Sequence, residues 1–144
     1  KIIQYVPGVS TIKITETEEK RILLKFQDGS FKDPFSIQHV SDGTLKLFAY
    51  LLMLYDPKPA PLLCIEEPEN QLYPSLLYRL SEEFESYALK GNQVFVTTHS
   101  PVLLDAIDLK SIYYLIKKDG FTEVFKAEDN PDIKRQIDAG DIPG

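Results

Sequence analysis

The chain has 144 residues, of which 43% are hydrophobic, and 16 basic against 22 acidic residues give it a net charge of −6. Duplex binding depends on neutralisation of phosphates by Lys and Arg, so any nucleic-acid role of the parent protein must lie mostly outside this acidic segment. No apolar run approaches the roughly 20 residues of a membrane helix, and no signal-peptide pattern opens the chain. We therefore expect one globular domain over residues 1–144, with no membrane association.

The single cysteine and the first residue bear on the origin of the chain. Cys64 is the only cysteine, which excludes an internal disulfide and fits a reducing, cytoplasmic location. The first residue is Lys1 rather than Met. We therefore expect the chain to be a piece of a longer protein.

Alternating polar and apolar residues predict an antiparallel hairpin in the first part of the chain. The alternation runs over residues 11–16 and again over residues 21–27, and a polar segment at residues 17–20 joins the two runs. Residues 30–40 follow, and Pro34 disfavours a helix there, so we expect an extended segment.

Apolar spacing and capping residues predict three helices in the middle of the chain. Residues 42–55 follow helical spacing, with Ser41 as the N-cap. A second helix begins at Pro74, and Gly91 is placed to end it at the C′ position. A short third helix over residues 100–106 opens with a Ser-Pro pair, which combines a cap with a favourable first residue.

Two apolar segments alternate with these helices and predict buried parallel strands. Residues 62–65 run directly into Glu66 and Glu67, and residues 94–96 run towards His99. Alternation of strands and helices indicates an α/β fold with a parallel sheet. Ligands of such sheets bind beyond the carboxyl ends of the strands, so we expect the two carboxylates and the histidine to meet at one rim.

The last part of the chain contains a second hairpin signal. Residues 111–117 and 121–126 are strand-like and flank an Asp-Gly pair at residues 119–120, which favours a tight turn. Residues 127–144 are charged and show little periodicity, so we expect them to be only partly ordered.

A helix start that contains a glycine is the third polar feature of the sequence. Residues 41–46 read Ser-Asp-Gly-Thr-Leu-Lys, and such a start presents backbone N–H groups and the positive end of the helix dipole. An anion such as phosphate suits this arrangement. Most Ser-x-Gly helix starts are only caps, so the pattern gains weight from its context.

Taken in order, these segments resemble the ATPase heads of the ABC superfamily. The similarity is closer to the RecF-like and chromosome-maintenance-like branch, and to bacterial predicted ATPases with Glu-Glu-Pro-Glu-Asn strands. Residues 41–43 stand at the signature motif, residues 62–67 match the Walker B strand, and residues 70–74 fall at the loop that crosses to the dimer partner. His99 matches the switch histidine, and the resemblance covers roughly residues 30–110.

The resemblance implies a fold and a role for each residue. The fold would be the parallel-sheet core of a P-loop NTPase, with antiparallel hairpins near both ends of the chain. Glu66 would hold Mg²⁺, and Glu67 would orient or deprotonate the attacking water. His99 would contact the γ-phosphate of ATP. Ser41 and the backbone of Gly43 would touch the γ-phosphate of a nucleotide held by a second subunit.

The sequence departs from the family pattern in two places. Glu66 stands where many relatives carry the shorter Asp, and no G-x-x-x-x-G-K-[ST] phosphate cradle occurs in the sequence. We therefore expect the C-terminal half of a head, inactive and weakly nucleotide-binding by itself. Its expected partners are its own N-terminal half and a second copy, joined through the nucleotide. Relatives linked to DNA repair or phage defence imply DNA and a nuclease as partners of the parent protein.

Other interpretations of these residues stay open. The chain could be a non-hydrolysing dimerisation or scaffold module that keeps the ATPase fold. It could also be a Mg²⁺-dependent nuclease that uses Glu66, Glu67 and Glu69. At the level of single residues, the two adjacent glutamates could be a solvated strand end, and His99 could be a capping or surface residue. Lys46 could reach a phosphate or lie on a solvated helix face.

Overall fold

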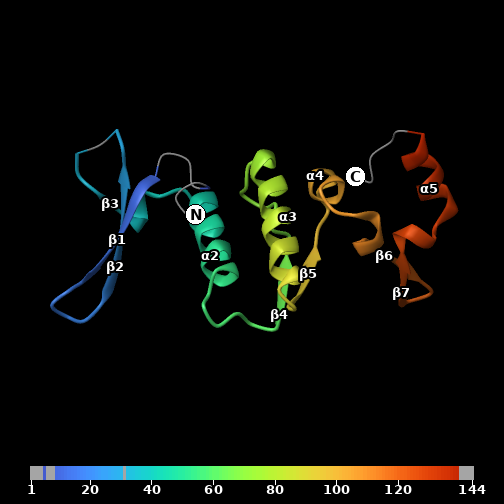
Figure 1. Cartoon of the computed structure of the whole chain (residues 1–144), viewed down its shortest axis with the longest axis horizontal. Helices are drawn as coiled ribbons and strands as arrows, with labels where there is room; N and C mark the ends of the chain where they lie inside the picture. The colour runs from blue at the N-terminus through green and yellow to red at the C-terminus, as the bar shows by residue number, and fades with distance from the viewer. Residues whose placement is uncertain (1–4, 6–8, 31, 140–144) are drawn as a thin grey trace.

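The structure is a computed structural model, and it describes residues 5, 9–30 and 32–139. Its described strands form an antiparallel sheet in the order β1-β2-β3, a parallel pair β4-β5 and an antiparallel hairpin β6-β7 (Figure 1). The strands are β1 (Val9–Glu16), β2 (Ile22–Asp28), β3 (Phe35–Ser36), β4 (Leu62–Glu66), β5 (Gln93–Thr97), β6 (Tyr113–Lys118) and β7 (Phe121–Lys126). The α-helices are α2 (Asp42–Leu54), α3 (Pro74–Leu89), α4 (Pro101–Asp105) and α5 (Pro131–Asp138), and the 3₁₀ helices are η1 (Ile37–His39), η2 (Leu109–Ser111) and η3 (Ala127–Asp129).

The predicted N-terminal hairpin is confirmed and packs on α2. Strands β1 and β2 pair antiparallel, with Glu16 opposite Ile22 at the turn. Phe26 of β2 is fully buried, and its ring meets that of Phe48 edge-on at a centroid distance of 5.7 Å. Such an aromatic pair contributes about 0.5–1.5 kcal/mol beyond its buried area. This contact holds α2 against the N-terminal sheet.

The segment over residues 30–40 is only partly extended. Strand β3 pairs with β2, as an extended segment should, but η1 follows it as a 3₁₀ turn. The backbone N–H of Val40 closes this turn on the carbonyl of Ile37 at 3.1 Å. Ser36 Oγ and His39 Nδ1 lie 3.2 Å apart across it. These local bonds explain why a purely extended segment was the wrong expectation here.

The predicted helices α2, α3 and α4 form with the predicted caps. The hydroxyl oxygen of Ser41 accepts a bond from the backbone of Thr44, and Pro74 stands in the first turn of α3. Gly91 follows α3 with a φ of +90°, the left-handed conformation that ends many helices. Ser100 caps α4 by accepting from the backbone of Leu103. Local sequence signals therefore decide where these helices begin and end.

Strands β4 and β5 are parallel, as predicted, but buried on one face only. Their inner face packs against buried residues of α2 and α3, in a cluster that includes Tyr50, Leu54, Ile65, Leu80, Phe84 and Tyr87. On the other face, Cys64 lies directly opposite Phe95, and both are exposed, Phe95 to 56%. The expectation of a fully buried strand is wrong for this face, because no layer covers it within the described part of the chain.

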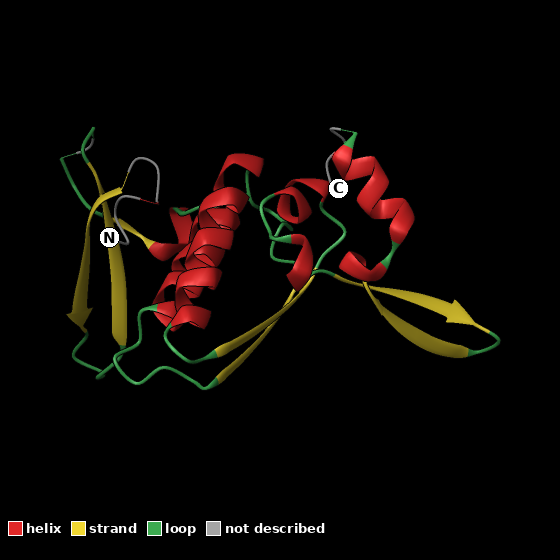
Figure 2. Cartoon of the chain, turned by 45° about the vertical axis from the view of Figure 1, so that its right-hand side comes forward, coloured by secondary structure: helices red, strands yellow, loops and turns green. Residues whose placement is uncertain are grey.

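The second hairpin is confirmed and extends away from the helices. Figure 2 shows β6 and β7 as a ribbon that projects from the rest of the molecule. Asp119 and Gly120 have φ values of 49° and 87°, so both central residues of the turn adopt the positive φ that a type I′ turn requires. At its base, the rings of Tyr114 and Phe125 stack at 5.4 Å.

The expectation of only partial order after residue 126 is wrong for residues 127–138. Helix η3 leads into α5, and Asn130 caps α5 by accepting from the backbone of Asp132 and Ile133. Pro131 follows the cap, which is the same start signal that opens α4. Residues 140–144 lie outside the described residues. None of the described helices is long and apolar enough to cross a membrane.

Two leucines of α3 test where the core lies. We expect Leu80→Ala to lower the free energy of unfolding by about 2–5 kcal/mol, because the removed side chain leaves a cavity in a packed cluster. Leu80 is 1% exposed, whereas Leu89 of the same helix is 81% exposed. The matched variant Leu89→Ala should stay within about 0.5 kcal/mol of the wild type. Urea denaturation measures both, and equal midpoints would contradict this assignment of the core.

Candidate active site

The site lies at the carboxyl ends of β4 and β5. Glu66 pairs with Thr97 at the end of the parallel ladder, and the backbone N–H of Glu67 donates to the Thr97 carbonyl at 2.9 Å. Because the pairing is parallel, the segments that follow the two strands leave the sheet at the same edge, which we call the rim. There, Nε2 of His99 lies 3.4 Å from Oε1 of Glu67. The expectation that Glu66, Glu67 and His99 share one rim is confirmed.

The backbone of Glu67 is held in an unusual conformation. Its φ is 40°, a left-handed value that is uncommon for a residue with a side chain. Its carbonyl accepts bonds from Nζ of Lys46 at 3.1 Å and from the backbone of Asn70 at 3.2 Å. Conformations of this kind cost about 1–3 kcal/mol and persist only where the surroundings enforce them, which occurs often at functional sites.

The Glu67 carboxylate is oriented by two neighbours. Asn70 Nδ2 donates to Oε2 at 3.2 Å, while His99 faces Oε1. The Glu67 side chain is 35% exposed and that of His99 is 90% exposed, so both reach solvent. A carboxylate in this position can accept a proton from a bound water, and the imidazole beside it can donate to an anion.

Lys46 has a role that neither sequence interpretation anticipated. Its Nζ donates to the carbonyls of Glu67 and Asn70, at 3.1 and 3.0 Å, and lies 5.8 Å above the ring of Tyr50. The side chain therefore fixes the loop after β4 to α2, rather than pointing freely into solvent. No local sequence signal reveals this contact, because it joins residues of two different elements.

Glu69 is the residue whose place sequence reasoning missed. One oxygen, Oε1, accepts a bond from the Thr98 hydroxyl at 2.7 Å and from the backbone N–H of His99 at 2.9 Å. The other oxygen, Oε2, is buried without a hydrogen-bond partner among the described residues. The available signal was the third glutamate of Glu-Glu-Pro-Glu, which the nuclease hypothesis grouped with Glu66 and Glu67.

The three glutamates that the nuclease hypothesis groups lie apart in the described part of the chain. Within the described ranges, no group of three or more His, Cys, Asp or Glu side chains is placed to hold a metal ion. Glu69 is bonded to the segment after β5 instead of converging with the other two glutamates. Glu66 is exposed at the strand end.

The pKa of Glu69 reflects a balance of burial and hydrogen bonds. Burial alone would raise the pKa, but backbone N–H groups of Glu69 itself and of His99, together with the Thr98 hydroxyl, favour the charged form. The net effect lowers the pKa below the ordinary value of 4.5. Glu69 is therefore a carboxylate at neutral pH and acts only as an acceptor.

The residues of the helix start lie against the loop after β4. The Ser41 hydroxyl is engaged by Thr44, and a Cβ added to Gly43 would stand 2.2 Å from the carbonyl oxygen of Gln71. This close approach is a steric reason for glycine at position 43. Ser41 therefore bonds within the first turn of α2, and Gly43 lies against the loop. The structure does not bring these two residues together with Glu67 and His99.

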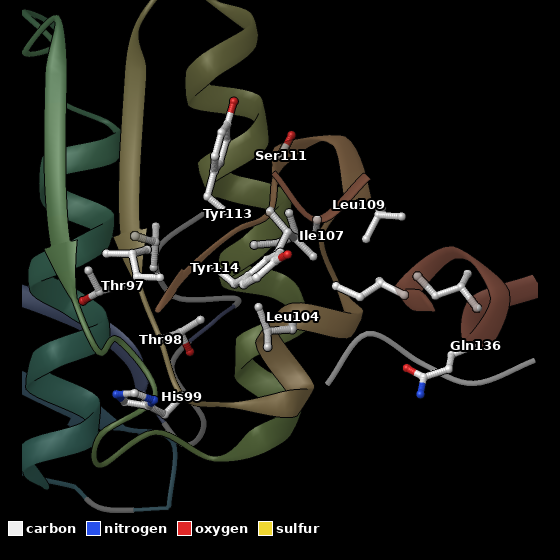
Figure 3. Close-up of a pocket in the computed structure, with 16 residues that line it drawn as sticks. Thr97, Thr98, His99, Leu104, Ile107, Leu109, Ser111, Tyr113, Tyr114 and Gln136 are labelled. Carbon is white, nitrogen blue, oxygen red and sulfur yellow. The ribbon is translucent and has the colours of Figure 1, made fainter. Parts of the chain in front are cut away.

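A cavity borders the site on the other side of β5. It has a volume of about 540 Å³ and opens between the end of β5, the α4–η2 region, β6 and α5. Figure 3 shows Thr98 and His99 on the β5 side, with Tyr113 and Tyr114 of β6 across from them. Apolar side chains such as Leu104 and Ile107 line its wall (Figure 3). The histidine therefore stands at the boundary between the exposed rim and an apolar hollow.

Gly43 provides a steric test of the loop contact. We expect Gly43→Ala to lower the free energy of unfolding by about 1–3 kcal/mol, because the new methyl group would overlap the backbone carbonyl of Gln71. Gly29 has open space around the corresponding position. The control Gly29→Ala should therefore change stability far less in the same denaturation experiment. A Gly43→Ala variant as stable as this control would show that the loop yields freely.

The lowered pKa of Glu69 predicts a pH-dependent contribution to stability. The folded pKa is depressed, so the stabilisation is present above the unfolded pKa of about 4.5 and is lost as pH falls through the folded pKa. The stability difference between wild type and Glu69→Gln should shrink between about pH 6 and about pH 3. Urea denaturation across this range measures it, with Glu82→Gln on exposed α3 surface as the control. A difference independent of pH would contradict the assignment.

Comparisons with known proteins bear on the family and the fold of the chain. The sequence model of a family described as "AAA domain, putative AbiEii toxin, Type IV TA system" matches residues 4–105. No curated protein matches the sequence. The matched range spans more than half of the chain and includes every predicted site residue.

Solved structures of SMC ATPase heads share the fold. One, from work on ATP-driven dimerization and DNA-stimulated activation of SMC ATPases, has a TM-score of 0.67 and 18% identity, over 97% of this chain and 86% of that chain. An Smc head bound to the C-winged helix domain of ScpA has a TM-score of 0.65 and 17% identity, over 86% of this chain. A head from Pyrococcus furiosus, bound to the C-terminal domain of ScpA, has a TM-score of 0.64 and 18% identity, over 95% of this chain.

The coverage of these relatives differs. This chain spans 39% and 35% of the two ScpA-bound chains, although it spans most of the first one. At these identities the likeness shows the fold, and the family match carries the assignment. The expected P-loop NTPase fold is confirmed by its likeness to the SMC ATPase heads, and the chain belongs to the family described as "AAA domain, putative AbiEii toxin, Type IV TA system".

Proposed function

We propose that this chain supplies the water-activating half of a head that binds and hydrolyses ATP. The observation that carries the proposal is the placement of Glu67, which is held at a φ of 40° with its carboxylate 3.4 Å from His99 at the end of a parallel strand pair. Phosphoryl transfer depends mainly on positioning and on charge stabilisation. A fixed carboxylate beside an imidazole offers both.

Each residue of the rim has a proposed role. Glu67 accepts the proton of the attacking water, because its carboxylate is oriented and reaches solvent. His99 donates to the γ-phosphate from the same rim. Glu66 is a suitable oxygen ligand for Mg²⁺, which prefers carboxylates, waters and phosphates. Bound Mg²⁺ would supply charge neutralisation for the phosphates.

The amino end of α2 is the proposed contact to a second subunit. Ser41 is exposed there, and the first N–H groups of a helix favour an anion. We propose that Ser41 and the backbone of Gly43 touch the γ-phosphate of a nucleotide held by another copy, which would make the head a nucleotide-sandwich dimer. The SMC ATPases of the first structural relative are described as dimerising in an ATP-driven manner, which supports this part of the proposal.

The phosphate cradle is proposed to lie on a further segment of the same head. No G-x-x-x-x-G-K-[ST] occurs among these 144 residues, and the chain spans only part of the ScpA-bound Smc heads. The exposed face of β4 and β5 around Cys64 and Phe95, together with the cavity beside His99, offers apolar surface for that segment. Patches of this kind mark interaction sites.

The biological setting we propose is DNA repair or phage defence. The family description names a toxin of a toxin–antitoxin system, and the first structural relative is described as activated by DNA. DNA and a nuclease are the corresponding partners of the parent protein. The absent cradle favours a second candidate function, a dimerisation or scaffold module that keeps the fold without hydrolysis.

The first experiment compares Mg·ATP binding by calorimetry for this chain and for the full-length protein. We expect binding only by the full-length protein, because only it would hold the phosphate cradle. Tight binding by the chain alone would contradict the cradle argument, and absence of binding in both would favour the scaffold.

Glu67→Gln tests the catalytic role within the full-length protein. We expect turnover to fall about 10²–10⁴-fold, because the amide cannot accept the proton, while ATP binding is retained. The exposed variant Glu82→Gln serves as the matched control. Steady-state ATPase assays measure both, and normal turnover in Glu67→Gln would overturn the assignment of this residue.

A further inference from the structure

Glu69 connects the two segments that carry the proposed chemistry. One segment is the loop that begins at Glu67, and the other follows β5 and contains His99. A single carboxylate oxygen, Oε1 of Glu69, accepts both the Thr98 hydroxyl at 2.7 Å and the His99 backbone N–H at 2.9 Å. They add to the strand-end bond between the Glu67 N–H and the Thr97 carbonyl, which also joins the two segments.

The bonds of Glu69 continue beyond His99. Because Thr98 Oγ1 donates its proton to Glu69, its lone pair is free to accept, and the backbone N–H of Ser100 donates to it at 2.9 Å. Ser100 in turn caps α4. The carboxylate therefore fixes the backbone before and after His99, and the histidine side chain is left to extend from a held segment.

The other end of Glu69 is equally well anchored. Pro68 before it is fully buried, and the loop after it is tied to α2 by Lys46, which donates to the Asn70 carbonyl at 3.0 Å. A carboxylate held at both ends can transmit the position of one segment to the other. A flexible surface glutamate could not do so.

The chemistry of the side chain also calls for an explanation. Oε2 is buried without a partner within the described part of the chain, and a buried acceptor left unpaired destabilises the fold. The charge strengthens the two hydrogen bonds that Oε1 accepts, since bonds to a charged acceptor are stronger than neutral ones.

We propose that Glu69 is a positioning residue for ATP hydrolysis: it holds the backbone of His99 so that the imidazole stays beside the Glu67 carboxylate. This inference rests on the proposed function. Glu69 touches neither water nor nucleotide in this role. It acts through His99, whose Nε2 lies 3.4 Å from Glu67, a separation that a small backbone shift would change.

Three substitutions separate this role from a general effect on folding. Glu69→Gln retains an acceptor oxygen for both donors and loses only the charge, so kcat should fall by about fivefold. Glu69→Ala removes the acceptor, and the resulting shift of His99 should lower kcat by about 10²-fold. KM for ATP should stay near the wild-type value in both. Thr98→Val removes one donor, and its effect should not add to that of Glu69→Ala, because both break the same contact.

The assay is steady-state ATP hydrolysis by the full-length protein, with Glu82→Ala as the matched control. Loss of kcat in Glu69→Ala with rescue by Glu69→Gln supports the positioning role. Wild-type kcat in Glu69→Ala, while Glu67→Gln is slow, overturns the inference and leaves the proposed function intact. A rise in KM with unchanged kcat also overturns it, because the residue would then act on binding.

Amide hydrogen exchange gives a second readout that does not depend on activity. The His99 N–H should exchange at least about fivefold faster in Glu69→Ala than in wild type, with no such change in Glu82→Ala. Unchanged exchange at His99 overturns the inference, whatever the ATPase result. If the wild-type protein hydrolyses no ATP, the proposed function fails and this inference about hydrolysis fails with it. The exchange data then still report whether Glu69 holds the segment.

Discussion

The parallel pairing of β4 with β5 is the constraint on which the site depends. The register sets Glu66 opposite Thr97, and one further bond, from the Glu67 N–H to the Thr97 carbonyl, extends the pairing past the strand end. Parallel strands leave a sheet at the same edge, so the two segments that follow them must run side by side. A change of register by one residue would turn Ile65 away from the core and move the glutamates relative to His99.

Three contacts then shape the loop that leaves β4, and each has a different physical basis. Lys46 of α2 donates hydrogen bonds to two carbonyl groups of the loop. Gly43 allows the loop to approach α2 more closely than any side chain would permit. Glu69 binds the opposite segment through one oxygen. Because these contacts come from separate elements, the geometry of the rim is determined by how these elements pack together. The sequence of the loop alone does not determine it.

Local signals made much of this fold predictable from the sequence. Alternation, Asp-Gly and the caps at Ser41 and Ser100 depend only on neighbouring residues, and the elements they predicted are present. Helix α5 was missed although Asn130 and Pro131 carry the same start signal, because its short charged sequence shows little periodicity. The inward turn of Glu69 could not be predicted, since it depends on a segment about thirty residues away along the chain.

The left-handed backbone of Glu67 has a consequence for the evolution and engineering of the domain. At a φ of 40°, glycine would relieve the strain, so the most stable residue at this position is one without a carboxylate. Backbone stability and the proposed chemistry therefore compete at a single residue. Redesign of this domain for stability alone would tend to select against Glu67, the residue proposed to activate the attacking water.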